Sequence, residues 1–523
     1  MTAWLACARS VAAVVSVFAT ISIGASRAAE AGPVVTIKAG ALEGVAANGV
    51  QSFKGIPYAA PPVGDLRWRD PAEPTPWTGT RKADAYGFSC LQKVFDDNGM
   101  TPGDLGPMSE DCLYLNVWTP EARAGAKLPV MVWIHGGAFV IGASNFAMTD
   151  GSNLAKRGAV VVSFNYRLGQ LGFFAHPSLG PVTDKTTANF GLMDQIAALK
   201  WVKRNIAQFG GDPANVTIFG ESAGAKSVAA MFASPKARGL FHKGIAQSTY
   251  AVPDMTSAKA LEMGANVATA AGLPGKDATA DQLRALPADA FSKLEGQGLT
   301  SSPVPIAGDK VLPRTIEAIF KSGDEAAVPL IIGDNSDDAS VALAFGVKPE
   351  DVLEKIKAAG FVAKLLYPGV NDEAERARQA TRDLIFTMLA RWTADRHAKR
   401  ALTWRYYFDY TAEKLRPKFP NGVPHGSEIV YTFDNVDVFE GTKPHATAAD
   451  RAYSKTVGDY WFNFARTGRP FAKGEPFWEP HRAGADRTII FEPSIRAERN
   501  FMRPRLNIMI GLTKIISSVM KPR

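Results

Sequence analysis

The sequence lacks the features that mark several other classes of protein. Its formal net charge is +8, yet it has no run of five or six like charges and no basic stripe interleaved with aromatic residues, which argues against nucleic acid as a partner. No internal repeat and no long linker rich in Gly, Ser or Pro divides the chain. Its 46% of apolar and 21% of charged residues are ordinary for a soluble protein with a substantial core.

Long hydrophobic runs are scarce as well. The stretch 11–23 is apolar, follows Arg9 and precedes small residues at 26–31, which is the pattern of a secretory signal peptide. It is too short to cross a membrane comfortably and has no stop-transfer flank, so we expect no stable membrane span. We therefore predict a signal peptide at 1–28 and an exported protein, periplasmic or secreted. An uncleaved anchor is the alternative.

Cysteine is rare, with three in 523 residues. Cys7 precedes the apolar stretch, so Cys90 and Cys112 remain after cleavage. A pair of cysteines in an exported chain indicates a disulfide, and closing a loop of this size contributes roughly 3 kcal/mol in the chain-entropy model. Two separate buried thiols are the alternative, because the sequence alone cannot show that the two side chains meet.

Patterns typical of strands and helices alternate along the chain. Strands are predicted at 113–118, 130–134, 159–165, 216–219, 244–247, 329–333 and 403–410. The segment 189–209 has apolar residues at helical spacing, whereas 34–77 is rich in turn-forming residues. This alternation predicts an α/β fold with a central, mostly parallel sheet flanked by helices on both faces.

Two stretches rich in Ala, Leu, Lys and Glu are predicted to be helical excursions that cap the functional face of the sheet. They lie near 257–294 and 348–399, inside a domain that we place at 33–505. The remaining segment, 506–523, is apolar with two lysines. We expect it to form a helix docked on the domain rather than one lying on a membrane surface.

A strand pattern at 216–219 stops at Gly-Glu-Ser-Ala-Gly, residues 220–224, and a helical pattern of small residues follows. This is the layout of a nucleophile elbow, a tight strand-to-helix turn that holds Ser222 in a strained, exposed conformation. The glycines at both ends are needed because a side chain there would collide with the neighbouring strand or helix. Three fixed positions in a glycine-rich chain also occur by chance, so the flanking patterns matter.

A second motif lies upstream of the elbow. The strand pattern at 130–134 runs into His-Gly-Gly-Ala, residues 135–138. Small residues there allow backbone N–H groups to approach a substrate carbonyl and stabilise a tetrahedral oxyanion. Alone this motif could be a plain turn, but before a Gly-x-Ser-x-Gly strand it is a strong signal.

A serine nucleophile needs a histidine base and an orienting carboxylate, which follow it in the order acid, then histidine. There are seven histidines in the chain. His425 has the best setting, in a loop after the 403–410 strand and beside a glycine. His397 lies in a helical pattern with Lys and Arg and is expected on a solvated face, whereas His445 and His481 are expected in polar loops.

The orienting acid is harder to choose. The strand predicted at 329–333 is followed by three carboxylates, those of Asp334, Asp337 and Asp338. Each follows a buried strand by a short loop, and the spacing alone does not distinguish them.

Taken together, these motifs resemble those of the type-B carboxylesterase and cholinesterase family of α/β-hydrolases, above all its exported bacterial members. The matching segments are Phe-Lys-Gly-Ile-Pro-Tyr at 53–58, Ser-Glu-Asp-Cys-Leu-Tyr-Leu-Asn at 109–116, Asn-Tyr-Arg at 165–167, the run 189–225 and Asn-Phe-Ala-Arg-Thr-Gly at 463–468. They cover nearly the whole mature chain. The resemblance implies an α/β-hydrolase fold and hydrolysis of small-molecule carboxylic esters through an acyl-enzyme.

The resemblance also implies roles for individual residues. These are nucleophile Ser222, base His425, acid Asp338, oxyanion donors Gly137, Ala138 and Ala223, a Cys90–Cys112 disulfide, and ion pairs Arg67–Glu110 and Arg167–Asp194. The sequence departs from the family pattern at the acid, where Asp replaces the usual Glu. Neither a metal nor a cofactor is implied. Lipase, lactonase, thioesterase or amidase specificity could use the same triad, and a non-catalytic binding scaffold of the same fold is the more distant alternative.

Overall fold

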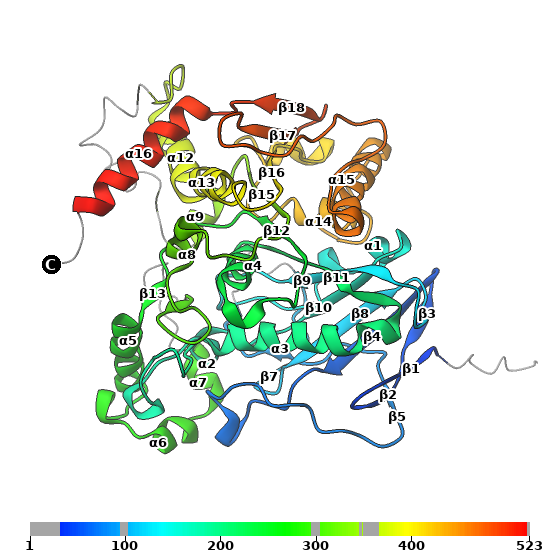
Figure 1. The fold of residues 1–523 in the computed structure, drawn as a ribbon, viewed down its shortest axis with the longest axis vertical. Coiled ribbons are helices and arrows are strands. Elements are labelled where there is room, and N and C mark those ends of the chain that lie inside the picture. Colours follow the sequence, from blue (N-terminus) through cyan, green and yellow to red (C-terminus); the bar gives the residue numbers. More distant parts are fainter. Residues whose placement is uncertain are drawn as a thin grey trace, which may run out of the picture. The chain divides into compact units, whose positions relative to one another are not determined.

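An eleven-stranded sheet forms the centre of the protein in a computed structural model that describes residues 32–94, 103–293, 304–344, 348, 364 and 366–519 (Figure 1). The predicted signal peptide lies outside the described residues, and the compact unit that contains the sheet begins at Pro33. The spatial order of the strands is β18-β17-β16-β15-β12-β11-β9-β10-β8-β4-β3.

The central strands, from β17 across to β10, pair in parallel, and the pairings at both edges are antiparallel. The strands are β3 (Val45–Ala47), β4 (Val50–Pro57), β8 (Tyr114–Thr119), β9 (Leu128–Ile134), β10 (Val160–Phe164), β11 (Gly211–Glu221), β12 (Lys243–Gln247), β15 (Leu330–Asn335), β16 (Thr403–Phe408), β17 (Arg487–Phe491) and β18 (Arg496–Arg499). The predicted, mostly parallel sheet is therefore confirmed.

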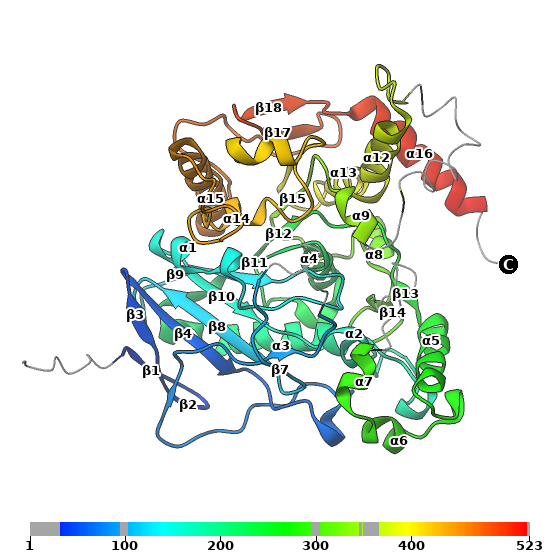
Figure 2. The same ribbon diagram turned by 180° about the vertical axis from the view of Figure 1, so that it is seen from behind.

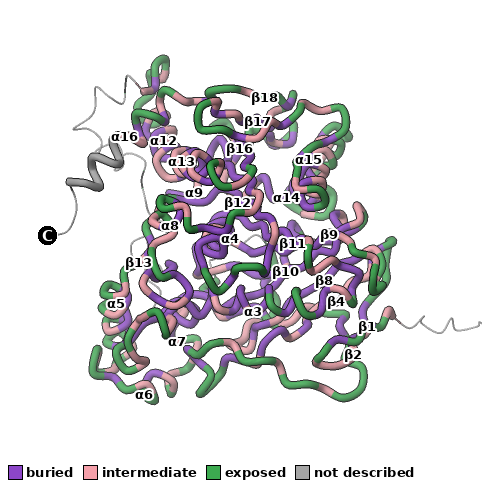
Figure 3. The backbone as a smooth tube through the Cα atoms, viewed as in Figure 1, coloured by how far each residue is buried: buried purple, intermediate pink, exposed green. Residues whose placement is uncertain are grey.

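Helices cover both faces of the sheet (Figures 1 and 2). They include α1 (Ser152–Lys156), α2 (Gly169–Gly172), α3 (Phe190–Asn205), α4 (Ala223–Ala233), α8 (Ile316–Ser322), α12 (Glu373–Arg382), the π-helix η8 (Asp383–Thr387), α13 (Met388–His397), α15 (Ala448–Thr467) and α16 (Arg503–Val519). Since successive side chains of a strand point to opposite faces, each strand contributes to two cores. Val130 and Val132 pack with α3 and α4, whereas Met131 and Trp133 pack with α1 and α15. Figure 3 shows the buried backbone concentrated along the strands.

Seven strands were predicted, and each overlaps an observed one, from β8 to β16. The segment 34–77 is more regular than predicted, because it contains β3 and β4 as well as β1 (Val34–Ile37) and β2 (Gly40–Glu43). Glycines at 40, 44, 49 and 55 lie within or between these strands, and they hide the alternation of apolar and polar residues. Helix α15 and strands β17 and β18 were not anticipated either.

Both predicted excursions are helical where the structure describes them. The first contains α5 (Ser257–Ala270), α6 (Ala280–Ala285) and α7 (Ala288–Lys293), and the second contains α12, η8 and α13. Helix α16 begins slightly before the predicted boundary, and its Leu506 is fully buried. None of the helices in the described part of the chain combines the length and apolarity that a membrane crossing needs.

Three predicted cross-links are present. A disulfide joins Cys90 to Cys112. Arg67 pairs with Glu110 at 2.5 Å, and Arg167 pairs with the fully buried Asp194 at 2.7 Å. The ion pair of Arg167 connects the loop after β10 to helix α3.

Candidate active site

The turn predicted to be a nucleophile elbow forms where β11 ends and α4 begins. Ser222 has a φ of 56° and a ψ of −120°, a conformation that residues with side chains rarely adopt. Its N–H donates to the carbonyl of Gln247 at 2.9 Å, and its own carbonyl accepts from the N–H of Lys226 at 2.9 Å. The turn is therefore held from both sides, and backbone strain of this kind concentrates at functional sites.

Close packing explains both glycines of the elbow. A Cβ on Gly220 would lie 2.6 Å from the carbonyl oxygen of Ile134, and a Cβ on Gly224 would lie 2.0 Å from the same atom. The predicted collision is thus with the end of β9. The same packing brings the loop after β9 to the serine, because a Cβ on Gly136 would lie 3.2 Å from the Cβ of Ser222.

The loop after β9 leaves backbone donors unpaired. Gly137, Ala138 and Phe139 have φ values of 98°, 54° and 64°, so the chain turns sharply away from its strand. Within the described residues, no protein acceptor bonds the N–H of Gly137, Ala138 or Ala223. The N–H of Ile141 donates to the carbonyl of Gly137 at 2.9 Å and fixes the loop. Unpaired donors beside a serine can stabilise a developing oxyanion.

His425 lies in the loop after β16, as the sequence indicated. Its Nδ1 is 2.7 Å from Oδ1 of Asp338, which is fully buried, and the other oxygen of Asp338 accepts from the N–H of Asn335 at 2.8 Å. The backbone N–H of His425 donates to Oγ of Ser340 at 3.0 Å. A carboxylate on Nδ1 selects the tautomer whose Nε2 can accept a proton.

The other two candidate carboxylates have different partners. Asp337 pairs with Arg378 at 2.6 Å, and Oδ2 of Asp334 accepts from Oγ1 of Thr387 at 2.5 Å. Burial raises the pKa of Asp334 to about 7, and the neighbouring charge of Asp338 contributes to this increase. Of the three aspartates, the structure brings only Asp338 to the imidazole.

Two glutamates near His425 were not singled out from the sequence. Oε1 of Glu221, the residue before Ser222, lies 3.1 Å from Nε2 of His425. Glu428 is buried behind it and accepts from Nε2 of Gln247 at 3.0 Å. The sequence held a signal for each of them: Glu221 is the second residue of the elbow motif, and Glu428 follows His425 by three residues.

Among the described contacts, Ser222 and His425 are not hydrogen-bonded to each other. Catalytic hydrogen bonds are often long before substrate binds.

The nearby carboxylates influence the charge of His425. Burial alone would lower the pKa of His425, but Glu221 and Asp338 raise it to about 9. Burial raises the pKa of Glu221 to about 8, against the lowering effect of His425. The surrounding carboxylates therefore stabilise the imidazolium form, the form that a histidine takes when it accepts a proton from a nucleophile.

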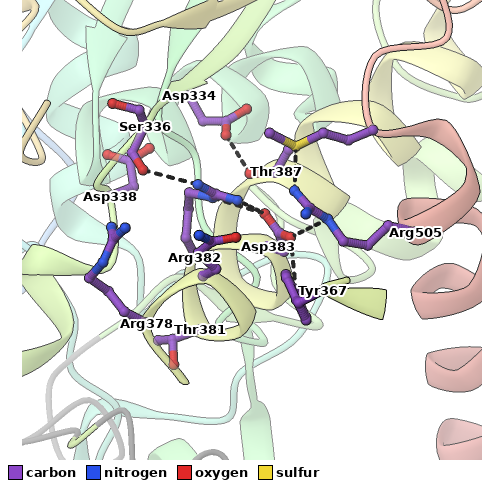
Figure 4. Close-up of polar contacts among 12 residues, drawn as sticks. Asp334, Ser336, Asp338, Tyr367, Arg378, Thr381, Arg382, Asp383, Thr387 and Arg505 are labelled. Atoms are coloured by element: carbon purple, nitrogen blue, oxygen red, sulfur yellow. Dashed lines mark hydrogen bonds and ion pairs between the residues drawn. The ribbon is translucent and has the colours of Figure 1, made fainter. Parts of the chain in front are cut away.

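A buried charge network anchors the loop that carries Asp338 (Figure 4). Nη1 of Arg382 donates to the carbonyl of Ser336 at 3.1 Å and to the hydroxyl of Tyr407 at 3.0 Å. Arg382 also pairs with Asp383 at 2.7 Å, and Asp383 pairs with Arg505 of α16 at 2.8 Å. The C-terminal helix is thus connected, through Asp383 and Arg382, to Ser336, two residues before Asp338.

One prediction about the remaining histidines is wrong. His397 was expected on a solvated face, but it is fully buried, with Nδ1 3.0 Å from Glu325 and Nε2 2.8 Å from the carbonyl of Val328. The cationic residues around it suggested exposure, yet α13 packs against α8 and the sheet and turns this position inward. His481 does lie in a loop, where it is buried, and His445 lies in a loop and is half-buried.

The parallel sheet, the strained serine between β11 and α4, and the histidine and aspartate on later loops define an α/β-hydrolase. The Carboxylesterase family matches the chain over residues 31–508. The chain therefore belongs to the carboxylesterase family and is a carboxylic ester hydrolase.

Individual relatives agree with this assignment. The chain is 36% identical over 485 residues to the para-nitrobenzyl esterase of Bacillus subtilis (strain 168), covering 89% of this chain and 96% of that one. It is 34% identical to the fumonisin B1 esterase of Sphingopyxis macrogoltabida, covering 84% and 83% of the two chains. A solved structure of a PNB esterase superposes with a TM-score of 0.76 at 34% identity, covering 90% of this chain and 99% of that one.

Proposed function

We propose that this chain cleaves carboxylic esters by a serine acyl-transfer mechanism. The triad consists of Ser222, His425 and Asp338, and the oxyanion donors are the N–H groups of Gly137, Ala138 and Ala223. The observation that carries the proposal is the 2.7 Å contact between His425 and the buried Asp338, beside a serine in an elbow conformation.

The reaction proceeds in two halves. His425 takes the proton of the Ser222 hydroxyl as the oxygen attacks the ester carbonyl, and the tetrahedral oxyanion is held by backbone N–H groups. The imidazolium then gives its proton to the departing alcohol, which leaves an acyl-enzyme. Water, deprotonated by the same imidazole, attacks the acyl group, and collapse of the second intermediate releases the acid and restores Ser222.

The residues around this site determine which acyl and alcohol groups of an ester the protein accepts. Phe139, whose ring packs 4.9 Å from that of Phe173, lies beside the oxyanion loop, and Phe386 lies 5.2 Å from the imidazole of His425. Relatives include proteins named acylcarnitine hydrolase and cocaine esterase, so the family includes several ester classes. We propose small esters as substrates. A panel graded by acyl and alcohol size, with a lactone, a thioester, an amide and a long triglyceride, separates the alternatives.

We further propose that the mature protein is exported after removal of residues 1–28. The Cys90–Cys112 disulfide supports this, because such bonds persist in oxidising compartments. N-terminal sequencing of protein from the periplasm or culture medium tests it. An intact N-terminus on exported, fully soluble protein would contradict the cleavage.

The catalytic assignment is tested by substitution of the nucleophile and the base. Ser222→Ala and His425→Ala should each lower kcat for a short activated ester by about 10⁴-fold or more, with folding intact by circular dichroism. Ser227→Ala, on the same helix, and His445→Ala are the matched controls and should retain most activity. An organophosphate should label the parent once, at Ser222. Activity of Ser222→Ala within tenfold of the parent would overturn the proposal.

A further inference from the structure

A cavity of about 480 Å³ lies beside the elbow helix α4. Its walls come from α4, the ends of β12 and β15, α8, and the continuous helix formed by η8 and α13, and neither Ser222 nor His425 is among its lining residues. Helix α8 contacts both α4 and α13, and Figure 1 shows the three helices close together. The volume is within the range of small-molecule sites, about 300–1,000 Å³.

The wall formed by η8 and α13 is apolar and only partly covered. Leu384, Met388, Leu389 and Trp392 line the cavity at helical spacing, and all are half-buried. On the opposite side, Phe232 of α4 is fully buried. An apolar stripe that faces a cavity instead of packed side chains is suited to an aliphatic chain.

The charged groups differ between the inside and the rim of this cavity. Inside, Lys226 is buried and pairs with Asp254 at 3.1 Å, so these charges compensate each other. At the rim, neither Lys321 nor Arg396 has a carboxylate partner within the described residues, and the one acidic rim residue, Glu317, is also unpaired. The rim therefore has an excess of positive charge, which favours an anionic head group.

The π-helix η8 connects the cavity to the candidate active site. Leu384 lines the cavity, and the carbonyl of the next residue, Ile385, accepts from the N–H of Ala251 at 2.8 Å. The ring of Phe386 lies 5.2 Å from the imidazole of His425. The hydroxyl of Thr387 donates to Asp334 in the strand before the acid loop. Single π-helical turns occur frequently at functional sites.

We propose that this cavity is a second ligand site that takes an aliphatic carboxylate, and that the bound chain changes turnover at Ser222 by shifting η8 and Phe386. The chain lies against the η8–α13 stripe, and the carboxylate lies between Lys321 and Arg396. The inference rests on the proposed function, because the effect of the bound chain is on turnover at Ser222.

The probe is dodecanoate, with dodecanol as the uncharged comparison. Isothermal titration calorimetry on protein whose Ser222 is blocked by an organophosphate measures binding without turnover. In parallel, hydrolysis of p-nitrophenyl acetate by unblocked protein is measured with increasing dodecanoate. We expect dodecanoate to bind and to change kcat with little change in KM, because the two ligands occupy different sites. Dodecanol should bind about three- to fivefold more weakly, since it lacks the charge contacts.

Variants distinguish this cavity from the catalytic pocket. Leu389→Trp fills the cavity and should abolish dodecanoate binding, so that dodecanoate no longer changes the kcat of this variant relative to its own value without dodecanoate. Leu402→Trp is the matched control at an exposed leucine outside the cavity and should behave like the parent. Arg396→Met should weaken dodecanoate binding about three- to fivefold and leave dodecanol binding unchanged.

The outcomes separate the two proposals. Purely competitive inhibition that Leu389→Trp leaves unaltered would place dodecanoate in the catalytic pocket and overturn the second site. Absence of calorimetric binding would overturn it as well, and so would binding without any effect on kcat, because the coupling to Ser222 would be missing. Failure of the proposed triad would appear differently, as undiminished hydrolysis by Ser222→Ala.

Discussion

At the scale of single residues, three aspartates in one short segment have different environments. Asp338 contacts the imidazole of His425, Asp337 pairs with Arg378, and Asp334 is fully buried under Thr387. The three carboxyl groups are chemically alike, but each has a different partner. Substitution of each aspartate by asparagine should therefore affect activity to different degrees.

We expect Asp338→Asn to lower kcat by about 10⁴-fold, because without the carboxylate the imidazole can adopt the wrong tautomer. KM should change little, since Asp338 is fully buried and its contact is with His425. Asp337→Asn and Asp334→Asn serve as controls and should be much milder. Steady-state kinetics on a short ester measure all three. Near-parental activity of Asp338→Asn with loss in either neighbour would move the acid to that neighbour.

A second residue-scale prediction concerns pH. His425 acts as a base only when neutral, so kcat/KM rises with pH through the pKa of this histidine. Burial lowers that pKa, but Glu221 raises it most among the neighbouring charges. Glu221→Gln removes the negative charge that raises the pKa of His425. The acidic limb of the plot of kcat/KM against pH should therefore move to lower pH.

Glu428→Gln is the matched comparison for this experiment. Glu428 is the weakest of the identified contributors to the pKa of His425, so its substitution should move the limb less. The measurement is kcat/KM across the neutral and alkaline range for the parent and both variants. A limb that stays in place or moves to higher pH in Glu221→Gln would contradict the electrostatic role of Glu221.

At the scale of elements, η8 and its neighbours hold several parts of the molecule together. Asp383, at the first position of η8, bonds Arg382, the hydroxyl of Tyr367 and Arg505 of α16 (Figure 4). Thr387, at its last position, bonds Asp334. The C-terminal helix therefore contributes to the structure around the acid loop, although the two are far apart in the sequence.

We expect Arg505→Met to destabilise the protein by about 3 kcal/mol, because it leaves the fully buried Asp383 with one cation fewer. Arg503→Met is the control on the same helix. Its side chain makes only exposed hydrogen bonds, to Gly484 and Asn500, so the loss should be below about 1 kcal/mol. Urea denaturation followed by fluorescence measures both. Equal stabilities of the two variants would show that α16 does not need this ion pair.

At the scale of the whole molecule, one sheet supports two separate cores and places every proposed catalytic group after the end of a parallel strand. Ser222 follows β11, the oxyanion loop follows β9, Asp338 follows β15 and His425 follows β16. These strands are close in the sheet, so loops far apart in sequence converge at one edge. Ligand sites of open α/β sheets form at this edge for the same reason.

The disulfide affects the stability of the whole molecule, because it lowers the conformational entropy of the unfolded chain. Cys90 and Cys112 close a loop with a sequence separation of 22, and both are buried. The double variant Cys90→Ala/Cys112→Ala should lose about 3 kcal/mol of unfolding free energy in the chain-entropy model. Reductant should destabilise the parent by a similar amount and leave the variant unaffected. A parent insensitive to reductant during unfolding would contradict a stabilising bridge.

Much of the fold could be predicted from local patterns. The buried central strands are continuous apolar runs bounded by turn-forming residues, so each predicted strand overlaps an observed one. The edge strand β3, its neighbour β4 and the helix α15 were missed, since their apolar residues are interrupted or half-exposed. His397 was placed on the wrong face for a related reason: a helix that packs on two sides buries positions that its cationic residues suggest are exposed.

The sequence by itself determined the elbow around Ser222 and the Gly-Gly loop, because both are backbone turns that glycine and neighbouring residues encode locally. It also indicated His425 from its loop. Only the tertiary structure decided which aspartate meets that histidine, that Glu221 and Glu428 surround it, and that α16 reaches the acid loop through Arg505. These are contacts between segments far apart in the chain, set by the order and register of the parallel strands, and no local pattern records that order.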